Sequence, residues 1–416
     1  MQASKGSARV GQRMETIKPR FLSGILVILA AVLALQGTLH AQWGELEMPL
    51  PTNDPGWRKV KTLWDTHWGG KNLAELIAAI TPLKDKYPDR MEPYFWLARA
   101  HYLHARYIRS EREHHYEQSE CFAVQACKLA PNNPLTIKVL VDTLIHSRDR
   151  AYIFSRYETL IRAYAPLKDE DALPPMRNYP EWDAIEALWD GRVDIQKAER
   201  VRVMFENLAK AHPSDALAQT WASHADYYVG ECYTSLGEHD TKALPLYHKG
   251  MAYAHKARTL EPLSVPTNYW YQNNLARSIQ FTSLINKARY LNDITTPLMY
   301  CDREYSTYSN FGPVLTLGVI IANGGWVAEQ GMKMAGIKME MAKNAMDIAE
   351  ILYPRHFTVP FIKADILACK GKKKEARAIL EKLLAKNPDD YPQPPYNLSF
   401  YRMAKTLYSQ IQDGKR

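Results

Sequence analysis

Apolar side chains recur at helical spacing along almost the whole chain beyond residue 55. Runs with apolar residues at positions i, i+3, i+4 and i+7 follow one another, while alternating patterns long enough for a β-strand are absent. In the segment Lys373–Lys386, for example, Ala376, Leu380 and Leu383 share one helix face. The pattern therefore predicts an all-α protein.

A proline recurs five residues after an apolar helix position, in the pairs Leu83/Pro88, Ala126/Pro131, Leu208/Pro213, Ala257/Pro262, Ala349/Pro354 and Leu383/Pro388. Proline has no backbone N–H and ends a helix. This pattern resembles the tetratricopeptide repeat, in which two antiparallel helices form a unit of about 34 residues. Pro354 and Pro388 are 34 residues apart, whereas earlier intervals reach 43 and 49. We expect a tetratricopeptide-like helical-repeat solenoid of antiparallel helix pairs, regular only in its last unit.

The segment 1–41 has the composition of a signal peptide. Five basic residues precede an uncharged apolar run from Phe21 to Leu35, and Leu39 to Ala41 offers a site with small residues for cleavage. Fifteen helical residues span only about 22 Å, short of the roughly 30 Å hydrocarbon core of a membrane. We predict an exported protein, periplasmic or otherwise extracytoplasmic, whose leader is either cleaved or retained as an anchor.

Prolines divide the remaining chain into two sets of helices. Residues 55–165 are predicted to form N-terminal helical repeats, and 166–182, with four prolines around an acidic stretch, a linker or loop. Residues 183–412 are predicted to form C-terminal tetratricopeptide-like repeats. Within them, the amphipathic segment Tyr396–Gln412 is expected to cap the final apolar face.

Composition excludes several classes of protein. The chain has 416 residues, 46% hydrophobic and 24% charged, with a formal net charge of +8. The leader's five bases and Glu15 contribute four of those charges, and the other bases lie among acids rather than in a stripe, so we expect no nucleic-acid partner. Five cysteines, an odd number, indicate no disulfide framework. Cys121 and Cys127 are expected to be buried small residues.

No linear motif for catalysis or cofactor binding occurs in the sequence. The nucleophile-elbow, phosphate-loop and dinucleotide-binding patterns are all missing. His101, His104, His114 and His115 form a histidine-rich patch without a carboxylate that would complete a metal motif, which favours surface histidines over a metal site. We therefore expect no enzyme, no cofactor and no metal.

The best binding candidates lie on one predicted inner helix and one later segment. Among 25 tyrosines and 10 tryptophans, each aromatic either lines a concave face or fills a helix crossing. The ligand-binding candidates are Tyr269, Trp270, Asn274, Arg277 and Trp326. Asn274 and Arg277 face the same way, and the guanidinium either takes a carboxylate of a ligand or ties two helices together. The ligand role predicts that Arg277→Ala folds normally and loses binding.

Three segments together resemble a known family. They are AYAHKARTLEP (Ala252–Pro262), NYWYQNNLARS (Asn268–Ser278) and FGPVLTLGVIIANGGW (Phe311–Trp326), followed by the regular last repeat. Their order is similar to that in the T component of tripartite ATP-independent periplasmic (TRAP) transporters. The resemblance covers roughly the second half of the chain. The chain departs from the family in one respect, because it has no lipoprotein cysteine after the leader and its first cysteine is Cys121.

The resemblance implies a periplasmic helical protein, often a trimer, with a groove or tunnel, which partners the substrate-binding protein of a transporter. We accordingly expect a non-catalytic accessory component that holds a small apolar or amphipathic ligand. The alternative is an envelope scaffold that binds an extended peptide of another envelope protein. A closed apolar pocket near Trp270 and Trp326 would favour the first function, and an open polar groove the second.

Overall fold

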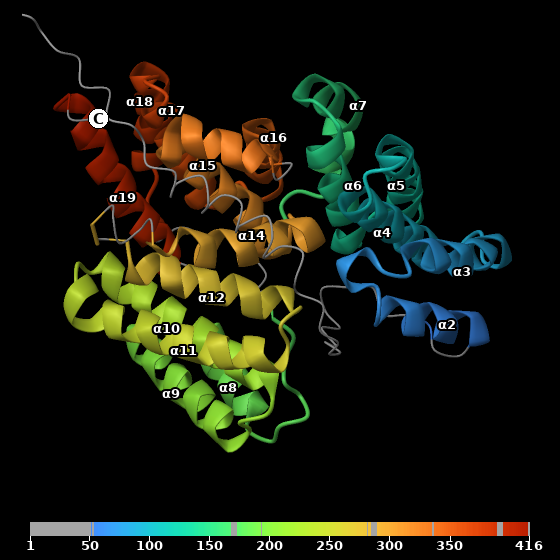
Figure 1. The fold of residues 1–416 in the computed structure, drawn as a ribbon. Helices are drawn as coiled ribbons and strands as arrows, with labels where there is room; N and C mark the ends of the chain where they lie inside the picture. The colour runs from blue at the N-terminus through green and yellow to red at the C-terminus, as the bar shows by residue number, and fades with distance from the viewer. Residues whose placement is uncertain are drawn as a thin grey trace, which may run out of the picture. The chain divides into compact units, whose positions relative to one another are not determined.

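Helices make up nearly all of the regular structure in the computed structural model (Figure 1). The structure describes residues 51, 54–167, 173–192, 194–280, 282–283, 289–334, 337–388 and 394–414. Side chains 235, 323–329, 331, 334 and 394–396 are outside this description. Within these limits there are seventeen α-helices and no β-strand, which confirms the predicted all-α class. The leader and the acidic residues 169–171 lie outside the described residues.

The first set of helices follows the chain from α2 to α7. The bounds are α2 Pro55–Trp64, the 3₁₀ turn η1 Trp68–Gly70, α3 Leu73–Lys86, α4 Met91–Tyr107, α5 Arg112–Leu129, α6 Pro134–Ser147 and α7 Arg150–Ala163. From α2 to α6, each helix packs against the next one in the chain.

The second set runs from α8 to α19, and each helix again packs against the next. The bounds are α8 Trp182–Asp190, α9 Ile195–Ala211, α10 Ala216–Ser235, the π turn η2 His239–Ala243, α11 Leu244–Leu260, α12 Val265–Ser278, α14 Leu291–Tyr305, α15 Tyr308–Met334, α16 Met339–Leu352, α17 Thr358–Cys369, α18 Lys373–Leu384 and α19 Pro394–Gln412. Consecutive pairing of this kind is the packing of a helical-repeat array.

The recurrent prolines mark one type of helix end. Five helices, α3, α5, α9, α11 and α16, end two residues before the proline of their motif. In each, the residue just before the proline donates its N–H to the carbonyl of the repeated apolar residue, Leu83, Ala126, Leu208, Ala257 and Ala349. Proline supplies no further donor, so the helix stops there. The backbone of the five terminal residues is nearly the same, with φ between −118° and −139° and ψ between 61° and 77°.

The last repeat has the predicted shape. In α18, Ala376, Leu380 and Leu383 are the buried residues, and Gly371 precedes the helix with a φ of +74°, a conformation that suits glycine. The final helix α19 packs on α17 and α18 and also reaches back to α10. The predicted capping segment therefore joins the end of the array to an earlier helix.

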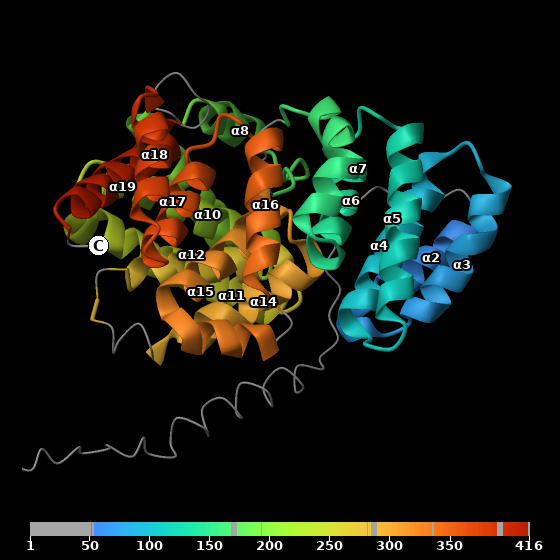
Figure 2. The ribbon, with the colours of Figure 1, turned by 90° about the horizontal axis from the view of Figure 1, so that it is seen from above.

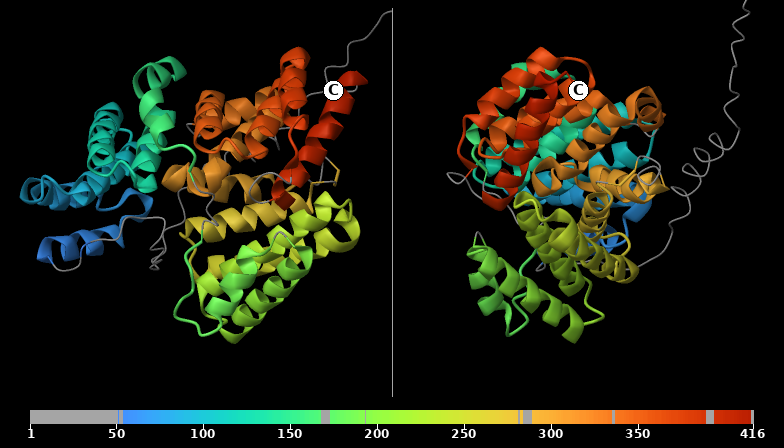
Figure 3. Two further views of the ribbon diagram at one scale, coloured as in Figure 1. Left: turned by 180° about the vertical axis from the view of Figure 1, so that it is seen from behind. Right: turned by 90° about the vertical axis from the view of Figure 1, so that its left-hand side faces the viewer.

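The N-terminal helices pack against the C-terminal part of the chain. Helices α6 and α7 contact α16, and α4 contacts α14, so the apolar core of α2–α7 continues into α15–α19 (Figure 2). Helices α8–α10 are built around a second apolar cluster, with α8–α12 on one side of α14 and α15–α19 on the other (Figure 3).

The structure tests the expectation that Cys121 and Cys127 are buried. Cys127 is buried as expected, but Cys121 is exposed, because the two lie on different faces of α5. All five cysteines are free.

None of the helices in the described parts of the chain is long and apolar enough to cross a membrane.

Candidate functional site

Helix α12 begins with an N-cap formed by Ser264. Ser264 precedes it in an extended conformation, and its hydroxyl accepts the N–H of Thr267 at 3.4 Å. Pro266 occupies the first turn, where a missing N–H costs nothing. The helix then packs against α10, α11 and α14. This packing places the side chains of Tyr269, Trp270 and Asn274 in the interior.

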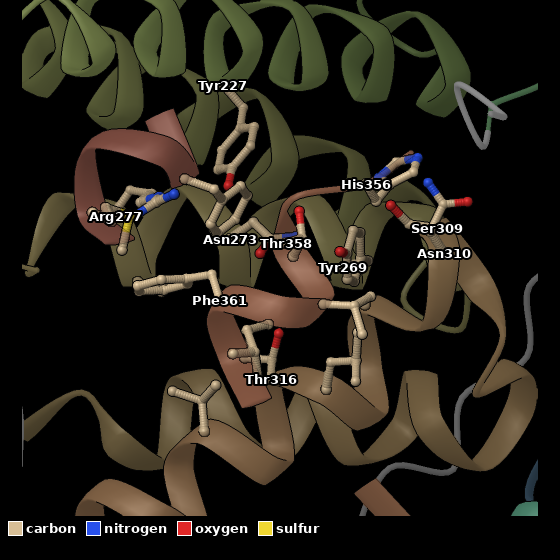
Figure 4. Close-up of a pocket in the computed structure, with 18 of the residues that line it drawn as sticks. Tyr227, Tyr269, Asn273, Arg277, Ser309, Asn310, Thr316, His356, Thr358 and Phe361 are labelled. Carbon is tan, nitrogen blue, oxygen red and sulfur yellow. The ribbon is translucent and has the colours of Figure 1, made fainter. Parts of the chain in front are cut away.

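A pocket of about 360 Å³ opens beside α12. Its walls come from α10, α12, α15, α17 and α19 and from the turn before α17. We call it the α12 pocket, and its lining includes Tyr227, Tyr269, Trp270, Asn273, Arg277, Ser309, Asn310, Leu315, Thr316, His356, Thr358, Phe361, Ile362, Asn397, Phe400 and Met403. Figure 4 shows Arg277, Tyr227 and Phe361 toward one end and Ser309, Asn310 and His356 toward the other.

The structure brings three of the five candidate residues into this pocket. Tyr269, Trp270 and Arg277 line it, whereas Asn274 does not. Trp326 lies on α15, but its side chain is outside the described residues. The α12 residues therefore form one wall, and the position of the Trp326 ring relative to that wall stays a prediction.

Asn274 is a packing residue. Its side chain is fully buried, and its Nδ2 atom donates to Ser223 Oγ and to the Trp270 carbonyl oxygen, both at 3.0 Å. A Cβ atom on Gly250 would lie 2.5 Å from Asn274 Oδ1. Asn274 thus occupies the close crossing of α10, α11 and α12, and glycine at 250 leaves it room.

Arg277 is held by a buried carboxylate. Its Nη2 atom donates to Glu231 Oε2 on α10 at 2.7 Å, and its Nη1 atom donates to Gln280 Oε1 at 2.7 Å. Tyr247 donates its hydroxyl to the other oxygen of Glu231 at 2.7 Å. Burial opposes the charge of Arg277, but Glu231 raises the pKa of the guanidinium above its ordinary value. The guanidinium therefore ties α12 to α10, as in the second alternative drawn from the sequence.

Aromatic rings make up much of the apolar lining and pack against one another. Trp270 stacks on His224 with ring centroids 3.9 Å apart, and Tyr269 meets Tyr308 edge-on at 5.0 Å. The ring centroids of Phe361 on α17 and Phe400 on α19 are 5.6 Å apart. Burial lowers the pKa of His224 well below its ordinary value, so that ring is neutral.

The first turn of α15 has an unusual backbone at the pocket wall. Ser309, Asn310 and Phe311 have φ values of 47°, 56° and 69°, in the left-handed region that non-glycine residues seldom occupy. Ser309 and Asn310 line the pocket, and the buried Oδ1 atom of Asn310 has no hydrogen-bond partner within the described chain. Strained backbone of this kind is concentrated at binding sites in proteins.

The pocket combines apolar surface with uncharged polar groups. No carboxylate is among its described lining residues, and its one guanidinium is matched by Glu231 behind the wall. Hydroxyl and amide groups, among them those of Asn273, Ser309 and Thr358, line the pocket together with the rings of Trp270 and Phe361. Such an arrangement can hold a molecule that is mostly apolar and forms a few neutral hydrogen bonds.

Most of the pocket was not predicted from sequence. Thr316, Thr358, Phe361 and Phe400 come from helices far from α12 in the chain, and no short-range pattern connects them. The segment 311–326 was singled out only for its resemblance and for Trp326. It contributes Gly312, Leu315, Thr316 and Val319 instead.

Three of the four histidines of the patch are buried, contrary to the expectation from the sequence, whereas His114 is exposed as expected. His101, His104 and His115 are each less than a tenth exposed. The Nδ1 atoms of His101 and His115 are 2.8 Å apart, and the rings of His104 and His115 stack at 3.6 Å. Among the described residues, no group of three or more His, Cys, Asp or Glu side chains is arranged to hold a metal ion. Burial and then the neighbouring histidines lower the pKa of His101 to about 3.

Comparisons with family models and with curated proteins found no match to this chain.

Proposed function

We propose that this protein is a non-catalytic binding protein that holds a small amphipathic molecule in the α12 pocket. The pocket carries the proposal, because about 360 Å³ lined by aromatic rings and neutral polar groups suits a small organic ligand. An extended peptide would need a long open groove with a row of backbone partners. We therefore favour a small ligand over a peptide.

The proposed ligand has an uncharged head group. Arg277 already donates to Glu231 and Gln280, so its charge and two of its donors are in use. The side chains of Tyr269, Asn273, Ser309 and Thr358 offer hydroxyl and amide groups without charge. An alcohol, an amide or a neutral ring system with an apolar body fits this chemistry better than a carboxylate.

The proposal extends to location and partner. The basic and apolar leader favours export to the periplasm or another extracytoplasmic site. The resemblance of Asn268–Ser278 and Phe311–Trp326 to the T component of TRAP transporters supports an accessory transport role. In that role the protein, as a homotrimer, docks the substrate-binding protein of the transporter.

Native mass spectrometry of the protein purified from its own host tests the pocket. We expect a bound small molecule that Thr316→Phe removes, because the larger ring fills the pocket. The matched control is Thr81→Phe, at an exposed threonine on α3, which should keep the molecule.

The outcomes separate the two functions. A retained small molecule in the wild type and in Thr81→Phe, but not in Thr316→Phe, supports the proposal. A protein that carries no small molecule and instead copurifies with a peptide would favour the envelope scaffold. Subunit number is read from the same spectra, and a monomer would contradict the proposed trimer.

A further inference from the structure

A second recess is lined by residues of α4–α6 and α14–α16. Its volume is about 540 Å³, and its walls come from the α4–α5 turn, the α6–α7 turn, α14 and the junction of α15 and α16. We call it the basic cleft after the seven basic residues that line it, Arg106, Arg109, Arg112, Arg148, Arg303, Lys333 and Lys338. None of these residues lines the α12 pocket.

Only two of the seven bases are neutralised by the protein. Arg106 pairs with Asp302 at 2.7 Å, and Arg148 pairs with Glu120 at 2.8 Å. Within the described chain, the other five form no ion pair with a carboxylate. Arg112 donates its Nε atom to the Ala105 carbonyl at 3.0 Å, which positions its guanidinium beside the cleft.

The acidic residues of the cleft have local tasks. Glu113 and Glu340 lie in the first turns of α5 and α16, and Asp149 caps α7 by accepting the N–H of Tyr152 at 2.8 Å. Carboxylates in these places stabilise the positive ends of helices. With Asp302 and Glu120 included, seven bases stand against five carboxylates, so a formal surplus of two positive charges remains.

The floor of the cleft is neutral and fixed. His146 accepts a hydrogen bond from Arg106 through Nδ1, and its Nε2 atom lies 2.6 Å from Ser306 Oγ. Burial lowers the pKa of His146 well below its ordinary value, so the ring adds no charge. On the wall, Asn344 is buried and donates to the Arg148 carbonyl at 3.1 Å. The surplus charge therefore belongs to the rim.

The geometry points to a binding site for a small polyanion in the basic cleft. Arginine forks match phosphate and carboxylate oxygens, and the unpaired bases stand on separate walls, with Arg109 and Arg112 on one and Lys338 on another. One anionic group reaches one wall, whereas a molecule with two or more phosphate or carboxylate groups bridges them. The site is independent of the α12 pocket and of its proposed ligand.

Isothermal titration calorimetry of the purified chain with pyrophosphate, citrate and acetate tests this site. We expect saturable binding of one equivalent of at least one polyanion and none of acetate. The double variant Arg109→Gln with Lys338→Gln should weaken that binding about tenfold or more, because each charge-assisted hydrogen bond that is lost contributes to the free energy of binding. The control variant is Lys59→Gln with Lys71→Gln, at an exposed lysine on α2 and an exposed lysine just after η1. It removes the same charge and should change the binding affinity less than twofold.

Each outcome supports the site or overturns it. Binding of pyrophosphate alone identifies a phosphate site, binding of citrate alone identifies a carboxylate site, and binding of both identifies a site that reads charge only. Equal weakening in the two double variants would assign the binding to general surface charge and overturn the proposal. Absence of saturable binding by either polyanion would also overturn it.

Discussion

The α12 pocket and the basic cleft are built by the same helical array, but they use charge in opposite ways. In the pocket, Arg277 is matched by the buried Glu231, so the lining presents hydroxyls, amides and rings. In the cleft, Arg109 and Lys338 have no carboxylate partner among the described residues. The comparison teaches that a charged side chain in a recess indicates an ionic ligand only when the protein does not already neutralise it.

The largest expected effect is on the buried charge of the pocket. Arg277→Ala should lower the free energy of unfolding by about 3–5 kcal/mol, because it leaves Glu231 buried without its cation. Urea denaturation followed by circular dichroism measures the change. The sequence alone allowed this variant to fold normally, and the ion pair predicts otherwise.

A paired variant serves as the control for that prediction. Arg277→Met combined with Glu231→Gln removes both charges and should recover most of the lost stability. If Arg277→Ala loses less than about 1 kcal/mol, Glu231 is not the isolated charge that the ion pair implies. The contrast between pocket and cleft would then disappear.

Acid should weaken the helices that form one wall of the cleft. The pKa values of His101 and His115 are lowered to about 3 and about 4, below the ordinary 6.5. Between the lowered folded-state pKa values and the ordinary 6.5, the unfolded chain binds more protons than the folded chain. The free energy of unfolding is therefore highest above pH 6.5 and decreases as the pH falls below it. His101 alone should account for about 2 kcal/mol between pH 7 and pH 5.

The measurement is the difference in unfolding free energy between wild type and His101→Leu across this pH range. Asp142, whose pKa burial raises to about 6, gives the opposite slope in both proteins and drops out of the difference. A pH-independent difference between wild type and His101→Leu would contradict the prediction.

A smaller effect concerns the packing of the pocket wall. A Cβ atom on Gly312 would lie 2.0 Å from Tyr269 Oη, so Gly312→Ala must displace the tyrosine ring. We expect a net loss of about 1–2 kcal/mol after the gain in helix propensity is subtracted. Gly191→Ala, whose Cβ would meet the flexible Lys197 side chain at 3.0 Å, should change stability by less than about 0.5 kcal/mol. A more stable Gly312→Ala protein would show that Tyr269 moves freely.

The smallest expected effect sharpens the comparison from the other side. Arg109→Gln with Lys338→Gln should leave the free energy of unfolding within about 0.5 kcal/mol of wild type, because neither base has a carboxylate partner in the described structure. Thermal unfolding measures this. A large loss of stability would place these bases among the structural charges, with Arg277.

Sequence alone determined the helices and their ends. The pairing of an apolar residue with a proline five positions later predicted five of its six helix ends, because the last hydrogen bond joins the apolar residue's carbonyl to the residue four positions on. The sixth differs, since α18 ends at Leu384, four residues before Pro388. The faces of α18 and the existence of α12 also followed from spacing within one or two turns. These features depend on interactions within about five residues, which a linear pattern contains.

Tertiary structure alone decided the partners of those helices. Tyr269, Trp270 and Arg277 were identified from α12, but the opposite wall came from α15, α17 and α19, and Arg277 is neutralised by Glu231, 46 residues earlier. Likewise, no sequence pattern placed α6 and α7 against α16 or indicated that His101, His104 and His115 are buried. Apolar faces of amphipathic helices resemble one another, so which faces meet depends on the packing of the whole array and not on any one segment.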